Sequence, residues 1–105
     1  MLELDGDNFE TEILEAEGLA VVDFWSESCE PCKELAPDFE ELAEKYEEEA
    51  RFATLDIQGN RRLALGQQVM GLPSIVIYED GEKKEHLTGD DLTIDEVEDA
   101  LQKYL

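Results

Sequence analysis

The segment from Leu19 to Trp25 is apolar at every position except Asp23. A strand with apolar side chains on both faces must be covered on both faces, as the central strands of α/β proteins are. The segment therefore predicts a central strand, and with it a sheet that has helices on both sides. It is too short for a membrane-spanning helix, which needs about 18 or more apolar residues.

Strand and helix patterns alternate along the rest of the chain, whose 105 residues correspond to a single domain, residues 1–105. We predict strands at Met1–Leu4, Leu19–Trp25, Arg51–Ile57, Ser74–Tyr78 and Lys83–Leu87, and helices at about Asp7–Glu15, Cys29–Glu48, Arg61–Gln68 and from Thr93 onward. Alternation gives parallel strands with right-handed crossovers, and a turn at Glu79–Glu82 adds an antiparallel hairpin. The expected fold is α/β, with a mixed five-stranded central sheet flanked by four helices.

Two of the predicted helices begin with residues that commonly cap helices. Asp7 or Asn8 is expected to cap the first helix. Thr93 is expected to cap the last one, and Glu96, three residues further on, completes a capping box.

Charge excludes several kinds of partner. The chain has 29 acidic and 8 basic residues, a net charge of −21. Nucleic acids and anionic membrane surfaces are poor partners for such a surface, because their phosphates need the opposite charge. The first residues, Met1 to Asp5, lack the basic start and apolar core of a signal peptide. We therefore expect a soluble, cytoplasmic protein.

The segment most indicative of chemistry is Cys29-Glu30-Pro31-Cys32, which follows the central strand and opens the longest helix. Free backbone N–H groups and the helix dipole at that place stabilise a thiolate at the first cysteine. One helical turn separates the two cysteines, so their sulfurs can meet with little backbone movement. Pro31 suits the first helical turn, where its missing N–H costs nothing, and it stiffens the loop.

Two other interpretations of the cysteines stay open. A CxxC pair can be half of a zinc site, but zinc takes four ligands and the chain offers two cysteines and His86. We expect His86 to be an exposed strand residue without a role, and we predict no metal site. The cysteines could instead be buried and inert, although ligands and reactions collect where a central strand meets a helix in open α/β sheets.

Three motifs together resemble the thioredoxin family: Val22-Asp23-Phe24-Trp25, Cys29-Glu30-Pro31-Cys32-Lys33 and Gly71-Leu72-Pro73. The similarity covers nearly the whole chain and implies a thioredoxin fold and thiol–disulfide oxidoreductase activity without a bound cofactor. Further segments are similar to the thioredoxins that serve glycine reductase in amino-acid-fermenting anaerobic bacteria. These segments are Trp25-Ser26, Asn60-Arg61-Arg62-Leu63 and Met70-Gly71-Leu72-Pro73-Ser74.

The resemblance implies a role for each matching residue. Cys29 would attack the target disulfide and Cys32 would resolve the mixed disulfide. Asp23 matches the buried aspartate that is proposed to help deprotonate the resolving cysteine.

The resemblance also implies a substrate-binding surface. Pro73 matches the family's cis-proline, beside which the backbone of Leu72 can pair with an extended substrate. Trp25 and Pro31 match residues of the same surface.

The implied partners are disulfide-containing target proteins and a flavoprotein thioredoxin reductase, with glycine reductase components as a narrower possibility. The protein is expected to act as a monomer.

The chain departs from the family pattern at three positions. Ser28 stands where a tryptophan is usual, Glu30 where glycine is usual, and Thr54 where many thioredoxins carry a lysine near the buried aspartate. Three functions therefore compete: a general protein disulfide reductase, a dedicated electron donor to one enzyme system, and a binding module whose cysteines are dispensable.

Overall fold

A computed structural model describes all 105 residues and contains one five-stranded sheet in the order β1-β3-β2-β4-β5. The strands are β1 (Leu2–Leu4), β2 (Leu19–Trp25), β3 (Ala50–Asp56), β4 (Ser74–Glu79) and β5 (Glu82–Thr88). β3 pairs in parallel with both β1 and β2, whereas β4 is antiparallel to both β2 and β5. The predicted mixed sheet is confirmed, and the apolar strand β2 is its central strand.

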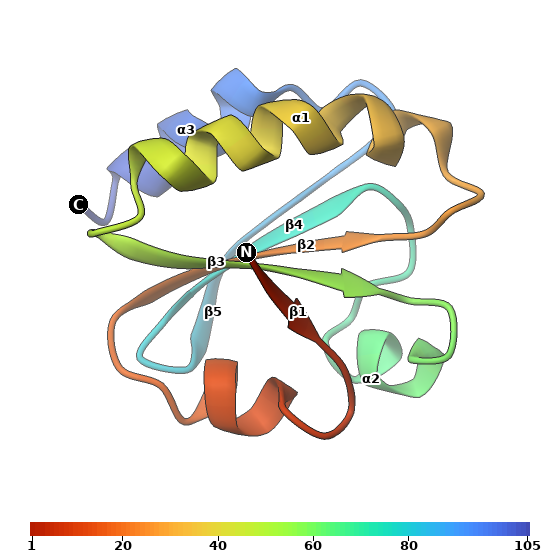
Figure 1. Cartoon of the computed structure of the whole chain (residues 1–105), viewed down its shortest axis with the longest axis horizontal. Helices are drawn as coiled ribbons and strands as arrows, with labels where there is room; N and C mark the ends of the chain where they lie inside the picture. The colour runs from red at the N-terminus through yellow and green to blue at the C-terminus, as the bar shows by residue number, and fades with distance from the viewer.

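Helices cover both faces of this sheet (Figure 1). They are the π-helical segment η1 (Glu10–Leu14) and the α-helices α1 (Glu30–Lys45), α2 (Arg61–Gly66) and α3 (Ile94–Gln102). In Figure 1, α1 and α3 lie together over one face, and α2 lies on the other face with the short red-orange helix η1. No helix is both long and apolar enough to cross a membrane.

Side chains of β2 enter two separate hydrophobic cores, because successive residues of a strand point to opposite faces. Val21 joins the core beneath α1 and α3, where Phe39 and Phe52 meet edge to face at 5.6 Å between ring centroids. Val22 and Phe24 join the other core. Full burial of each such side chain contributes about 1.5–3 kcal/mol, so both cores stabilise the sheet.

The first helix differs from its prediction. Asn8 does not cap η1, because its Oδ1 accepts a hydrogen bond from the backbone N–H of Asp5 at 2.8 Å. Asp5 Oδ1 in turn accepts from the N–H groups of Asp7 and Asn8, and no side chain caps the helix at Phe9. The short side chains of Asp and Asn can form hydrogen bonds either within a turn or with the first N–H groups of a helix. Here both side chains form their hydrogen bonds within the turn.

The other helix starts follow the sequence more closely. Thr93 Oγ1 accepts a hydrogen bond from the N–H of Glu96 at 3.3 Å, which confirms the predicted cap of α3. Cys29 has extended backbone angles and occupies the N-cap position, so α1 begins one residue later than predicted and ends at Lys45.

Candidate active site

Cys29 and Cys32 form a disulfide at the amino end of α1, with their Cα atoms 5.3 Å apart. Cys29 Sγ also accepts a hydrogen bond from the backbone N–H of Cys32 at 3.2 Å, so the sulfur itself acts as the cap of the helix. Cys29 is half-buried, whereas Cys32 is only 2% exposed. A partner molecule can therefore reach the first sulfur and not the second.

Polar residues surround the accessible sulfur. Ser26 Oγ lies 3.1 Å from Ser28 Oγ, and the Ser26 carbonyl accepts from the N–H of Cys29 at 3.1 Å. Lys33 Nζ is shared between Glu27 at 3.4 Å and Glu30 at 3.8 Å. Because the Glu30 side chain is 79% exposed, water weakens its interaction with both Lys33 and the sulfur.

Asp23 is a buried carboxylic acid in the middle of the sheet. It is 3% exposed, and its Oδ1 has no hydrogen-bond partner. Its neighbours in register are Thr54 on β3 and Ile75 on β4, neither of which carries a positive charge. Burial raises the pKa of Asp23 from its ordinary value of 3.8 to about 7, since a low-dielectric environment disfavours the charged form.

The peptide bond between Leu72 and Pro73 is cis. Two side chains hold the loop around it: Ser74 Oγ donates to the Gly71 carbonyl at 2.6 Å, and Thr88 Oγ1 donates to the Pro73 carbonyl at 2.8 Å. The backbone N–H and C=O of Leu72 form no hydrogen bond within the chain. These two groups are therefore free to pair with another extended segment.

Sequence reasoning did not identify Ser74 and Thr88 as part of the site. The one feature that could have identified them is that both carry a hydroxyl group and lie at the ends of neighbouring strands, where the register pairs them. His86 is exposed on β5, as predicted, and its Nε2 lies 3.2 Å from Ser74 Oγ. Desolvation lowers the pKa of His86, which favours the neutral ring.

A cavity of about 830 Å³, which we call the Cys29 groove, lies between α2 and the cysteine loop, residues 26–29 between β2 and α1. Its lining residues are Ser26, Ser28, Cys29, Glu30, Pro31, Ile57, Arg61, Ala64, Leu65, Val69, Met70, Gly71, Leu72 and Asp90. Of the predicted site residues, Cys29, Pro31 and Leu72 thus share one cavity. Trp25 and Pro73 do not line it, nor do Asp23 and Cys32, which are both buried.

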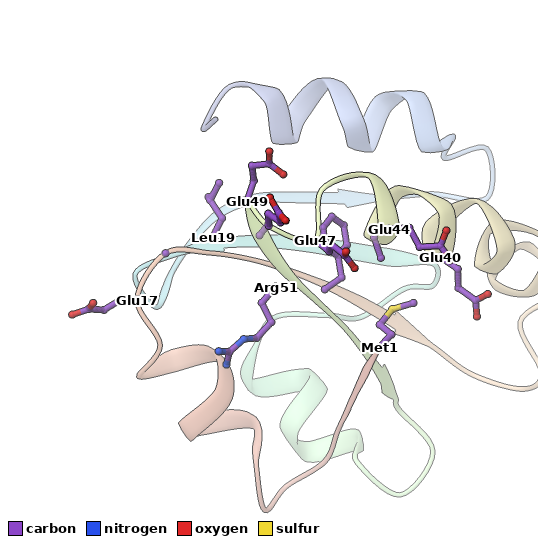
Figure 2. A pocket seen from close by; sticks show the side chains of 13 residues that line it. Met1, Glu17, Leu19, Glu40, Glu44, Glu47, Glu49 and Arg51 are labelled. Carbon is purple, nitrogen blue, oxygen red and sulfur yellow. The ribbon is translucent and has the colours of Figure 1, made fainter.

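A second hollow, of about 700 Å³, lies at the amino ends of β2 and β3 and contains none of the predicted site residues (Figure 2). Glutamates dominate its rim, among them Glu40 and Glu44 on α1. Arg51 at its edge is engaged elsewhere, because its Nη1 lies 2.7 Å from a carboxylate oxygen of Glu12 in η1. No group of three or more His, Cys, Asp or Glu side chains could hold a metal ion.

The sequence is similar to those of known thioredoxins. The thioredoxin family model matches residues 1–103. The chain is 51% identical to the thioredoxin of Acetoanaerobium sticklandii over 105 residues, which is the full length of both proteins. It is 44% identical to the thioredoxin of Peptoclostridium acidaminophilum over 105 residues, all of this chain and 96% of the relative. With the thioredoxin of Buchnera aphidicola it shares 38% identity over 78 residues, 74% of this chain and 72% of the relative.

Proposed function

The chain belongs to the thioredoxin family, and from that premise we propose which role each site residue has in disulfide exchange. The family function is oxidoreduction of protein disulfides by the couple of Cys29 and Cys32. The observation that carries our assignment of roles is the unequal exposure of the two sulfurs at the start of α1.

In the reduced protein, Cys29 is the nucleophile. The amino end of α1 stabilises its thiolate, which attacks one sulfur of the target disulfide and releases the other as a thiol. The buried Cys32 then attacks Cys29 in the mixed disulfide and releases the second target thiol. Two electrons pass to the target, its two thiols take up two protons, and the protein is left with the Cys29–Cys32 disulfide.

Asp23 accepts the proton of Cys32 during the second step. A general base works best with a pKa near the working pH, and burial raises the pKa of Asp23 to about 7. β2 carries Asp23 and Val21 on the same face, beneath α1 and its buried Cys32. Thr54 supplies no lysine charge beside Asp23, so burial alone tunes this acid.

The target binds as an extended segment against the loop of the cis-proline. The free N–H and C=O groups of Leu72 support this mode, because an added strand needs one donor and one acceptor. Pro31 and Leu72 line the groove that holds the segment. Pro73 shapes the loop, and Trp25 is anchored at the end of β2, just before the cysteine loop, where its carbonyl accepts from the Ile57 N–H at 2.9 Å.

The partners are disulfide-containing proteins, and a thioredoxin reductase restores the dithiol, as family membership implies. We further propose that residues 1–105 form one domain that acts as a cytoplasmic monomer. The similarity to two thioredoxins of amino-acid-fermenting clostridia supports glycine reductase components as the physiological acceptor. The exposed Ser28 and Glu30 beside the sulfur favour such a dedicated donor over a general one.

Two serine variants test the assignment of roles. We expect the parent protein to accelerate the reduction of insulin by dithiothreitol and each variant to fail. Cys32→Ser should accumulate a mixed disulfide with insulin, detected by mass spectrometry, because its nucleophile is intact and its resolving thiol is missing. Cys29→Ser is the matched control and should accumulate none. Trapping by Cys29→Ser alone would reverse the two roles.

A further inference from the structure

The outer wall of the Cys29 groove contains the most exposed large apolar side chains of the protein. Met70 is 83% exposed and Leu65 is 60% exposed, and both line the groove. The other exposed large hydrophobic residues, Met1, Leu14 and Leu105, do not line it. Apolar side chains gathered at a concave surface indicate binding of an apolar group of a partner.

The same wall carries a cation with no partner in the chain. Of the eight basic residues, five form ion pairs within 4.0 Å and Lys83 donates to the Gln67 carbonyl. Only Arg61 and Arg62, the first residues of α2, form neither an ion pair nor a side-chain hydrogen bond. Arg61 lines the groove and Arg62 does not.

An unpaired guanidinium stands out in a chain of net charge −21, in which five of the eight basic residues form ion pairs. Its five N–H donors match a carboxylate, which they can bind through two parallel hydrogen bonds. The groove also contains Glu30, the first residue of α1, and Asp90, which lies in the segment between β5 and α3. The groove therefore has one position that attracts a substrate carboxylate and two that repel it.

We propose that the Cys29 groove selects target disulfides in which the attacked cysteine has an acidic residue and an apolar residue close to it in the target's sequence. Arg61 pairs with the aspartate or glutamate of the target segment, and Leu65 and Met70 contact its apolar side chain. Because Arg61 and Cys29 line the same groove, the acidic residue lies close to the target cysteine in sequence, and the peptides below examine the three positions on each side of it. This proposal rests on the proposed function, because the segment must be held while Cys29 attacks it.

Matched peptides test the selection. Each is a disulfide-linked homodimer of a blocked seven-residue peptide with a central cysteine and one leucine, and glutamate replaces glutamine at one position at a time. The rate of reduction by the dithiol form of the protein is followed under single-turnover conditions. The best glutamate peptide should react about two- to fivefold faster than its glutamine counterpart, the range that one exposed ion pair supports. The preference should shrink in 1 M NaCl.

Two arginine variants test whether Arg61 causes the preference for glutamate peptides. In Arg61→Gln the ratio of glutamate to glutamine rates should fall to about one. In Arg62→Gln, which removes the same charge from outside the groove, the ratio should stay at the parent value. Equal rates for both peptides with the parent protein, an unchanged ratio in Arg61→Gln, or an equal loss in both variants would overturn the proposal.

The apolar contact is tested with a second peptide pair, in which serine replaces the leucine. The parent protein should reduce the leucine peptide faster, and Met70→Ser should lose that advantage while keeping its preference for glutamate. An advantage that persists in Met70→Ser and in Leu65→Ser contradicts the apolar part of the proposal. A parent protein that reduces neither these peptides nor a small aromatic disulfide would refute the proposed function itself, and the selection with it. Reduction of all of them at equal rates would refute the selection alone.

Discussion

Replacing Asp23 with asparagine should change how stability depends on pH. Asp23 has a pKa of about 7 in the folded protein, against an ordinary value of 3.8. Well below pH 3.8 the carboxyl is protonated in both the folded and the unfolded protein, so its burial carries no cost from ionisation. As pH rises from about 4 to about 7, the unfolded chain releases this proton and the folded protein retains it. Stability from this site is therefore fully present at low pH and is lost as pH rises through the folded pKa.

The size of the effect follows from the two pKa values. A difference of about three pH units corresponds to about 4 kcal/mol, since one unit is worth about 1.4 kcal/mol. Asparagine stays neutral at every pH, so it removes this loss. Its buried amide adds a cost of about 1–3 kcal/mol for unmet hydrogen bonds, but that cost does not vary with pH. The pH dependence therefore tests the burial of Asp23 better than the stability at one pH does.

The assay is urea denaturation of the oxidised proteins between pH 4 and pH 8. The free energy of unfolding of Asp23→Asn minus that of the parent should increase by up to about 4 kcal/mol between pH 4 and pH 8. Asp38→Asn, which removes an exposed carboxylate from α1, controls for the loss of one negative charge. A constant difference between Asp23→Asn and the parent would refute the reasoning. Exchange with insulin should also slow in Asp23→Asn, because the proposed base for Cys32 is gone.

Two further predictions concern the acidic surface. Glu30→Gly should raise the reduction potential, measured against a glutathione buffer, by about 20 mV at most. The negative charge of Glu30 beside the Cys29 thiolate destabilises the reduced form. The effect is small because the Glu30 side chain is exposed to water. An unchanged or lower potential would mean that loop geometry outweighs this charge. Adding a few hundred millimolar salt should raise the melting temperature, because 29 acidic residues against 8 basic ones repel each other and salt screens that repulsion. A melting temperature independent of salt would show that the charges are too dispersed to matter.

Most of the fold could be predicted because it depends on local pattern. The apolar segment Leu19–Trp25 marked the central strand, and Thr93 marked the start of α3 by its own hydrogen bond. The pair Cys29 and Cys32 could be placed at a helix start because both lie within one turn of the same element. Asn8 was misassigned, since capping and turn formation use the same short side chain and only the surrounding backbone decides between them.

Sequence alone determined the features that neighbouring residues create: the alternation of strands and helices, the cysteine pair at the amino end of α1, and the net charge of −21. Tertiary structure decided which residues meet across the chain. It left Asp23 without a partner for Oδ1, joined the hydroxyls of Ser74 and Thr88 to the loop before β4, and brought Arg61 to the groove of Cys29. These contacts depend on strand register and helix packing, which are set by the burial of both cores together rather than by any single segment.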